Sequence, residues 1–155
     1  MIRIVFVCLG NICRSPMAEA IMKKMVFDMG LSKQFLIDSK ATSTEELGNP
    51  IYPLAKRKLE EKGIYNFSHH SQVFQKEDYD FYDYVIVMED SNIRNLMYII
   101  GNDSLLKIHK LIPDYDIDDP WYTRDFENTY NDICYGCSQL LEKIIKQENI
   151  KREGE

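Results

Sequence analysis

The stretch "VFVCLGNICRSPMAEA" (residues 5–20) reads as a buried strand that turns directly into a helix. Residues 2–8 form a continuous apolar run rich in β-branched side chains, which is typical of a strand buried on both faces. Ser15 and Pro16 then indicate a helix start, with Pro16 at the first helical position and an end expected near Gly30. The stretch therefore places two cysteines and an arginine at the mouth of a strand-to-helix turn.

The remainder of the chain alternates strand-like with helix-like segments. Strands are expected over residues 35–39, 82–89 and 104–111, and helices over 53–63, 91–100 (with Ser91 as its N-cap) and 126–146. This order predicts one α/β domain over residues 1–155, with helices on both faces of a four-stranded parallel sheet and a frayed end over residues 149–155. Ligands of such folds bind outside the carboxyl ends of the strands, and the first strand ends at Cys8.

Composition narrows the range of partners and compartments. The chain has 155 residues, 45% of them hydrophobic, which suffices for a core, and a formal net charge of -6, which argues against nucleic acids and anionic membranes as partners. Neither a signal peptide nor a run of membrane-spanning length is evident, so we expect a cytoplasmic protein. Its four cysteines should then be reduced and serve as core, catalytic or metal-binding residues.

The segment from Cys8 to Arg14 has the length and residue types of an anion-binding loop. A loop that leads into a helix N-terminus can curl so that its N–H groups point inward, and Gly10 eases this curl. Arg14 can grip two phosphate oxygens, and the amides that attract phosphate also stabilise a Cys8 thiolate, with Ser15 offering a hydroxyl. The pattern is not GxxxxGK[ST], which disfavours nucleotide hydrolysis. Taken alone, Cys8 would read as a buried strand residue and Arg14 as a surface cation.

Four stretches carry a resemblance to a known family. The string "CLGNICRSP" (8–16) resembles the signature of the low-molecular-weight protein tyrosine phosphatases, and "DPWY" (119–122) resembles the loop that bears their general acid. The segments "IDSKATSTEELGNP" (37–50) and "FYDYVIVMEDSN" (81–92) are similar to the middle of these proteins. The resemblance covers nearly the whole chain and implies a three-layer α-β-α, flavodoxin- or Rossmann-like phosphatase I fold.

The resemblance implies a two-step hydrolysis of phosphotyrosine that needs no metal or other cofactor. Cys8 would attack phosphorus while Asp119 protonates the leaving tyrosine, and water would then release phosphate from the phosphocysteine with Asp119 as base. Arg14 and the loop would hold the phosphate oxygens, the loop consisting of Cys8, Leu9, Gly10, Asn11, Ile12, Cys13, Arg14 and Ser15. Without the resemblance, Asp119 could be one of several solvated loop aspartates, and Asp118 is the neighbour most easily confused with it.

Further roles follow from the resemblance alone. Asn11 would hold the loop in shape, in a left-handed conformation, and His69 would hydrogen-bond to it, although His70 is an alternative. Cys13 would form a reversible disulfide with Cys8 and so protect it from irreversible oxidation; otherwise it is a small buried residue. Ile12 favours an aromatic substrate, because relatives that act on phosphoarginine carry threonine there.

The rim of the pocket is the part in which the sequence departs from the family pattern. Ile12, Glu45, Trp121 and Tyr122 are the expected pocket residues, and Glu45 and Glu46 together predict a bias against strongly acidic peptides. Gln72 stands where many relatives have arginine, so we expect a weaker ion pair at the rim or in the core. Tyr52 stands where many relatives have aspartate, and the consequence of that change does not follow from the sequence. The expected partners are phosphotyrosine proteins or peptides, with small aryl phosphates as further substrates, phosphate- or sulfate-like anions as ligands, and a monomer or weak homodimer.

Two competing functions use the same residues differently. An arsenate reductase would relay electrons through further cysteines, but Cys134 and Cys137 lie in a helical pattern and Asp119 is present. This pair reads as core packing rather than as half of a zinc site, and Gly136 between them suggests a close helix contact. A catalytically inactive phosphotyrosine-binding module is disfavoured by the intact Cys8 and Arg14.

Overall fold

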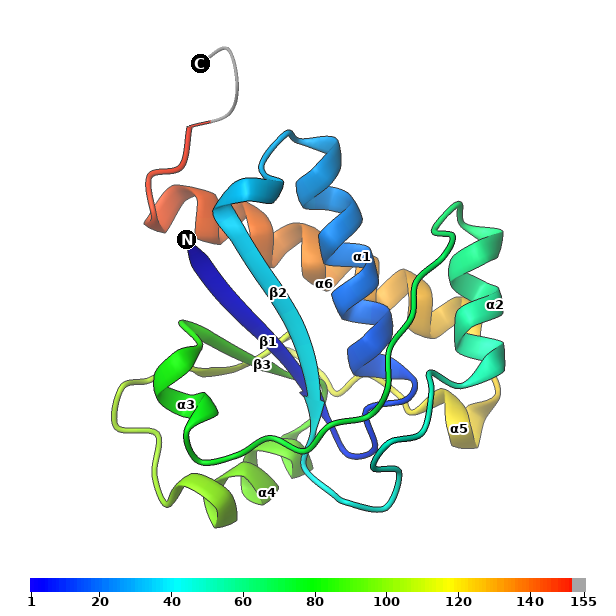
Figure 1. The fold of residues 1–155 in the computed structure, drawn as a ribbon, viewed down its shortest axis with the longest axis horizontal. Coiled ribbons are helices and arrows are strands. Elements are labelled where there is room, and N and C mark those ends of the chain that lie inside the picture. Colours follow the sequence, from blue (N-terminus) through cyan, green and yellow to red (C-terminus); the bar gives the residue numbers. More distant parts are fainter. Residues whose placement is uncertain (152–155) are drawn as a thin grey trace.

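A computed structural model describes residues 1–151 and shows a parallel four-stranded sheet in the order β2-β1-β3-β4 (Figure 1). The strands are β1 (Ile2–Cys8), β2 (Phe35–Ala41), β3 (Tyr84–Val87) and β4 (Ile108–Lys110). The helices are α1 (Arg14–Asp28), the 3₁₀ turn η1 (Ser32–Gln34), α2 (Pro53–Glu61), α3 (Asp78–Phe81), α4 (Asp90–Ile100), α5 (Pro120–Thr123) and α6 (Phe126–Gln147). The predicted α/β class and parallel sheet are therefore confirmed.

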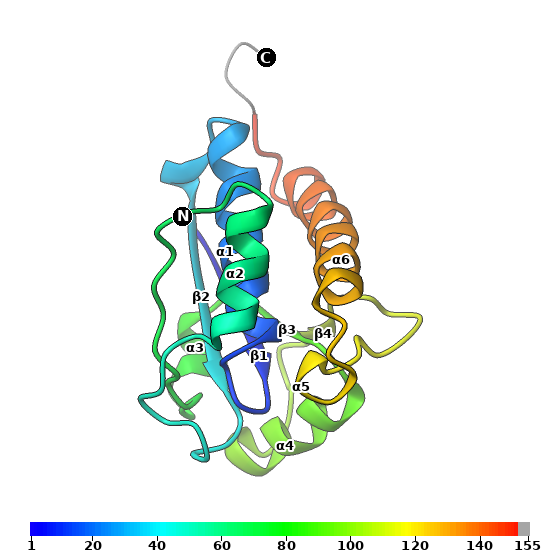
Figure 2. The same ribbon diagram turned by 90° about the vertical axis from the view of Figure 1, so that its right-hand side faces the viewer.

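Strand β1 lies at the centre of the sheet and separates two hydrophobic cores. Ile4, Phe6 and Cys8 point toward the layer of α1, α2 and α6, whereas Val5 and Val7 point toward α3 and α4. Figure 1 shows these two layers on opposite sides of the sheet, and in the view of Figure 2 α1 and α2 lie in front of it. Strand β1 pairs with β2 on one edge and with β3 on the other, and the two helical layers cover both of its faces from Ile4 to Cys8, as its apolar run predicts; Arg3 near its start is exposed.

Helix α1 begins two residues earlier than the sequence predicts. Pro16 is its third residue rather than its first, because the carbonyl of Cys13 already accepts the N–H of Met17 at 3.1 Å. Proline is tolerated at this position because the first N–H groups of a helix have no intrahelical partner. The loop is consequently shorter, and Arg14 and Ser15 belong to the first turn of the helix.

Ser91 was predicted to cap α4, and this was wrong. The N-cap is Glu89, whose side chain accepts the N–H of Asn92, while the Asn92 side chain accepts the N–H of Glu89. This reciprocal capping box satisfies two free backbone N–H groups, and Ser91 is already the second residue of the helix. Both later strands are also shorter than predicted; at β4, the Asp103 carboxylate takes up the N–H groups of Lys107 and Ile108.

Gly136 allows α6 to approach the sheet closely. A Cβ at this position would lie 2.5 Å from Cγ of Leu111, the residue that follows β4. The close contact expected from a glycine in mid-helix is therefore present, and it explains the glycine. Residues 149–151 follow the end of α6, and 152–155 lie outside the described residues. No helix in the described part of the chain is long and apolar enough to cross a membrane.

Candidate active site

The loop between β1 and α1 curls around the Cys8 thiol. Asn11 has a φ of +59°, in the left-handed region, and this turn points its backbone N–H at Cys8 Sγ, 3.3 Å away. Ser15 Oγ lies 2.9 Å from the same sulfur, from the first turn of α1. The thiol therefore lies within hydrogen-bonding distance of a backbone amide and a hydroxyl, next to a helix N-terminus, which is an environment suited to a thiolate.

The Asn11 side chain fixes the loop from behind. Its amide nitrogen donates to Ser15 Oγ at 2.8 Å, and its oxygen accepts the Gln72 N–H at 3.2 Å. The same oxygen lies 2.7 Å from His69 Nε2, so His69, not His70, is the histidine that contacts Asn11. Since Asn11 is fully buried, these bonds satisfy both ends of its side chain and hold the unusual backbone conformation in place.

His69 belongs to a polar cluster beneath the loop that the sequence did not reveal. Glu19 Oε1 accepts the Ser39 hydroxyl at 2.7 Å and lies 3.6 Å from His69 Nδ1. Burial lowers the pKa of His69, and this effect outweighs the opposing influence of Glu19. A neutral imidazole with a donating Nε2–H therefore buttresses Asn11.

Arg14 is almost completely buried, and acceptors on one side fix its guanidinium. Nη1 donates to the Glu89 carboxylate and to the Ile117 carbonyl at 2.9 Å, while Nη2 lies 3.4 Å from Asp119 Oδ2. Burial alone would lower the pKa of Arg14, but the negative charges of Cys8, Asp119 and Glu89 raise it above its ordinary value. Arg14 therefore remains a cation, held in a fixed orientation beside Cys8.

Asp119 reaches the site from the opposite wall. It is the N-cap of α5, and its Oδ1 accepts the Trp121 N–H at 3.0 Å, which turns Oδ2 toward Arg14. Asp118 is exposed and contributes only its carbonyl, to the Thr129 hydroxyl at 3.4 Å. Of these two neighbours, it is Asp119 that lines the pocket.

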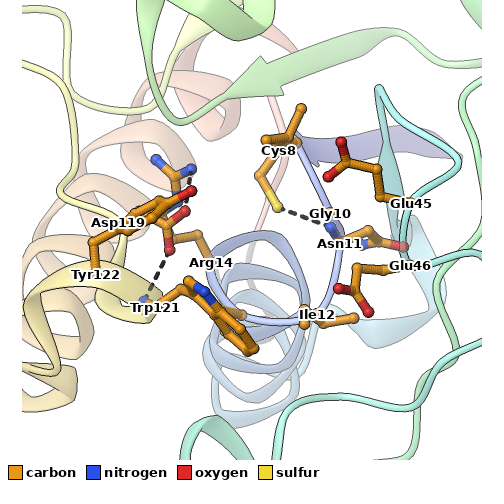
Figure 3. Close-up of a pocket in the computed structure, with 12 residues that line it drawn as sticks. Cys8, Gly10, Asn11, Ile12, Arg14, Glu45, Glu46, Asp119, Trp121 and Tyr122 are labelled. Carbon is orange, nitrogen blue, oxygen red and sulfur yellow. Dashed lines mark hydrogen bonds and ion pairs between the residues drawn. The ribbon is translucent and has the colours of Figure 1, made fainter.

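The remaining predicted residues surround one pocket whose floor is Cys8 (Figure 3). Trp121 and Tyr122 stand on one side of it, Glu45 and Glu46 on the other, and Ile12 between them; Leu9, Gly10, Asn11, Cys13, Arg14 and Asp119 complete the lining. Burial, with the nearby charges of Cys8 and Asp119, raises the pKa of Cys13. Cys13 is therefore a neutral thiol in the same pocket as Cys8.

The structure shows where Gln72 and Tyr52, which differ from the residues common in the family, lie relative to the site. Gln72 is exposed and serves the site only through its backbone N–H, so the side-chain difference at this position does not reach Asn11. Tyr52 lies beside Trp121, with ring centroids 4.9 Å apart. Glu89 was also missed as a site residue; its one signal was its place at the end of the predicted strand 82–89, at the edge where ligands bind.

Cys134 and Cys137 lie on α6 and are not among the residues that line the pocket. Cys137 is fully buried in the core that faces α1, and Cys134 packs at the edge of that core. Among residues 1–151, no group of three His, Cys, Asp or Glu side chains is arranged to hold a metal ion. Neither cysteine lines the pocket of Cys8, so neither is placed to exchange electrons with it.

The same combination of fold and loop occurs in a known family. A model of the family described as low molecular weight phosphotyrosine protein phosphatase matches residues 3–152. The chain belongs to this family. It is 38% identical, over 157 aligned residues, to the low molecular weight protein-tyrosine-phosphatase PtpA of Staphylococcus saprophyticus, covering 99% of this chain and 100% of that protein. The predicted membership is confirmed, and the protein is a hydrolase of this phosphatase type.

Solved structures agree with this assignment. The crystal structure of YfkJ from Bacillus subtilis superposes with a TM-score of 0.90 at 37% identity, covering 95% of this chain and 96% of that one. Vibrio vulnificus Wzb, solved in complex with benzylphosphonate, has a TM-score of 0.80 at 25% identity, covering 92% and 98%. The arrangement of sheet and helices in this low molecular weight phosphatase is thus shared along almost its whole length.

Proposed function

We propose that this phosphatase hydrolyses protein phosphotyrosine through a phosphocysteine formed on Cys8. The observation that carries the proposal is the convergence of three groups on one pocket. The Cys8 thiol lies on its floor, the buried Arg14 cation beside it, and the Asp119 carboxyl on the opposite wall, 3.4 Å from Arg14. A nucleophile, a phosphate-binding cation and an acid are the groups that transfer of phosphorus to sulfur requires.

In the first step the Cys8 thiolate attacks phosphorus in line with the bond to the tyrosine oxygen. The S–P bond forms and the P–O bond breaks with its electron pair on oxygen, which takes a proton from the Asp119 carboxyl. Asn11 N–H and the Ser15 hydroxyl contact the sulfur and keep it charged until it attacks. Arg14 and the loop amides bind the remaining phosphate oxygens and stabilise their charge.

In the second step water attacks the phosphocysteine. Asp119, now a carboxylate, takes the proton of the water, the S–P bond breaks, and the electrons return to the Cys8 thiolate. Inorganic phosphate is released, and the enzyme regains its starting protonation. The second step therefore uses the same two side chains with the roles of Asp119 reversed.

An aromatic leaving group fits the walls of the pocket. The apolar Ile12 and the rings of Trp121 and Tyr122 offer surfaces for a flat ring, and Trp121 and Tyr122 are exposed at the mouth where a protein substrate would approach. Benzylphosphonate, the ligand named for Vibrio vulnificus Wzb, likewise combines an aromatic ring with a phosphorus acid. We therefore favour phosphotyrosine over phosphoarginine, with small aryl phosphates as further substrates.

Hydrolysis of an aryl phosphate by the wild type, Cys8→Ser and Asp119→Ala tests the proposal. The wild type should turn over, Cys8→Ser should not, and Asp119→Ala should lose rate by roughly 10²- to 10⁴-fold. A ³²P label that rapid denaturation traps on the wild type after mixing with ³²P-labelled substrate, and that is absent from Cys8→Ser, would identify the phosphocysteine. A wild type without activity, or full activity in Cys8→Ser, would overturn the proposal.

We propose further that Cys13 protects Cys8 in a reducing cytoplasm. A peroxide would oxidise the Cys8 thiolate to a sulfenic acid, and the Cys13 sulfur would then form the disulfide as water leaves. Both thiols line the same pocket and are free, which supports this role. Dithiothreitol should restore the peroxide-treated wild type but not Cys13→Ser; equal recovery of the two would contradict the proposal.

A further inference from the structure

Tyr52 packs against the segment that carries Asp119. Its ring meets the Trp121 ring edge to face, with centroids 4.9 Å apart, and stacks on Phe126 at 6.1 Å. Its hydroxyl accepts a hydrogen bond of 3.0 Å from Arg124 Nη1, and the Arg124 guanidinium lies 5.8 Å from the Tyr52 ring and 5.7 Å from the Trp121 ring. We call Tyr52, Trp121 and Arg124 the Tyr52 clamp.

Tyr52 also forms a backbone hydrogen bond to the loop between β1 and α1. Tyr52 is the residue before α2, and its backbone N–H donates to the Ile12 carbonyl at 2.8 Å. One residue thus contacts the loop that holds Cys8 through its main chain and the segment that holds Asp119 through its side chain. No other residue named in the site bridges the two in this way within the described part of the chain.

Arg124 is held in an unfavourable backbone conformation. It ends α5 with a φ of +62°, a left-handed conformation that side chains with a Cβ rarely adopt, and its N–H bonds to the Pro120 carbonyl at 2.9 Å. Glycine would close this turn with less strain. The guanidinium, however, lies against two aromatic rings and bonds to the Tyr52 hydroxyl, which are contacts that glycine cannot make.

The segment that the clamp contacts, Asp119 and helix α5, packs only weakly against the rest of the protein. Helix α5 has only four residues, and apart from the buried Pro120 its side chains are exposed. Asp119 caps this helix through the Trp121 N–H, so a shift of Trp121 moves the carboxyl. We propose that Tyr52 and Arg124 are positioning residues that hold Asp119 at the distance from Cys8 needed to protonate the leaving group. This inference rests on the proposed role of Asp119 as general acid.

The dependence of rate on the leaving group tests the clamp. Phenyl phosphate needs a proton as it departs, whereas 4-nitrophenolate leaves without much help. We expect Arg124→Gly and Tyr52→Ala to lower kcat/KM for phenyl phosphate by about tenfold, and for 4-nitrophenyl phosphate by less than about threefold. Tyr52→Phe, which keeps the ring and loses only the hydroxyl, should show a smaller change in the same direction. Tyr98→Phe, a matched change at an exposed tyrosine on α4, should behave as wild type.

Two controls separate the clamp from loss of structure. Inhibition by inorganic phosphate should stay within about twofold of wild type in Arg124→Gly, because the phosphate-binding loop is untouched and glycine suits the backbone there. Asp119→Asn, assayed in parallel, should show the same selective loss for phenyl phosphate, but larger. If Asp119→Asn lacks this selectivity, the general-acid role itself is wrong. If Asp119→Asn shows it while Arg124→Gly and Tyr52→Ala slow both substrates equally, or slow neither, the clamp is wrong.

Discussion

The phosphate-binding loop and the Asp119 segment form opposite walls of one pocket but are held in different ways. The loop is short, and its key side chains are buried: Asn11 and Ser15 are fully enclosed and Arg14 nearly so. The Asp119 segment continues into a four-residue helix whose Trp121 and Tyr122 are 44% and 78% exposed. The loop side chains proposed to bind phosphate are therefore part of the core, whereas the proposed acid, Asp119, lies on a segment that continues into an exposed helix.

The difference in burial between the loop and the Asp119 segment indicates at which positions substitutions are tolerated without loss of activity. Each polar atom of Asn11 has a partner in the core, so a change there disturbs both packing and hydrogen bonding. The Asp119 segment is joined to the buried Arg14 by one ion pair, and its exposed helix α5 is held mainly by the contacts of Trp121 and Arg124 with Tyr52. We expect substitutions in the loop to abolish or cripple the reaction, and substitutions on the rim to change which substrates are used.

The largest effect is expected from Cys8→Ser. A serine hydroxyl is far less acidic than a thiol, so the loop should bind phosphate but not attack it, and turnover should fall by at least about 10⁴-fold. Steady-state hydrolysis of 4-nitrophenyl phosphate measures the loss, and calorimetric titration with inorganic phosphate measures the binding. Loss of phosphate binding would show that the sulfur itself, rather than the amides and Arg14, holds the anion.

Arg14→Lys tests the guanidinium that connects the two walls of the pocket, because Arg14 follows the loop and contacts Asp119. Lysine keeps the charge but cannot contact Glu89, Ile117 and Asp119 while also gripping two phosphate oxygens. We expect kcat to fall by roughly 10²- to 10³-fold, in line with the loss of one preorganised oxyanion donor. The measurement is kcat for 4-nitrophenyl phosphate; a loss below about threefold would mean that charge alone suffices.

His69, which hydrogen-bonds to Asn11, should make the free energy of unfolding depend on pH. Burial holds its pKa below the ordinary value of 6.5, so the unfolded chain takes up a proton more readily than the folded one. The stabilisation is therefore complete above about pH 6.5 and is lost as pH falls through the folded-state pKa, by up to about 1.4 kcal/mol per pH unit.

Urea denaturation from about pH 7 to about pH 5 measures this dependence. The free energy of unfolding should fall more steeply for the wild type than for His69→Gln, whose amide still donates to Asn11. His70→Gln is the control, because His70 does not contact Asn11. Parallel curves for wild type and His69→Gln would contradict the expectation.

The smallest effect is expected on the acidic rim. Glu45 and Glu46 line the pocket, and Glu46 accepts a hydrogen bond from Asn49 at 2.7 Å. Glu45→Gln with Glu46→Gln should raise kcat/KM for an acidic phosphotyrosine peptide by a few-fold at low salt and leave a basic peptide unchanged or slightly worse. Ionic strength of about 0.5 M should remove the difference. A gain of equal size for both peptides would exclude an electrostatic cause.

Elements and loop chemistry could be predicted where the responsible interactions are local. The apolar run of β1 and the order of strands and helices gave the parallel sheet, and the pattern from Cys8 to Ser15 gave the loop. Element ends could not be predicted as well. Pro16 lies two positions deeper in α1 than expected, and Glu89 rather than Ser91 caps α4, because competing backbone and side-chain bonds of similar strength decide where a helix begins.

By itself, the sequence determined which chemistry this protein can perform. Cys8, Asn11, Arg14 and Ser15 stand within eight residues, so the turn that brings them together is local. Only the tertiary structure decided what holds them. Glu89 and His69 are distant in sequence from the loop, and Tyr52 meets Trp121 and Arg124 from a separate segment of the chain. Contacts of this kind depend on how helices pack on the sheet, and no local pattern of residues encodes that packing.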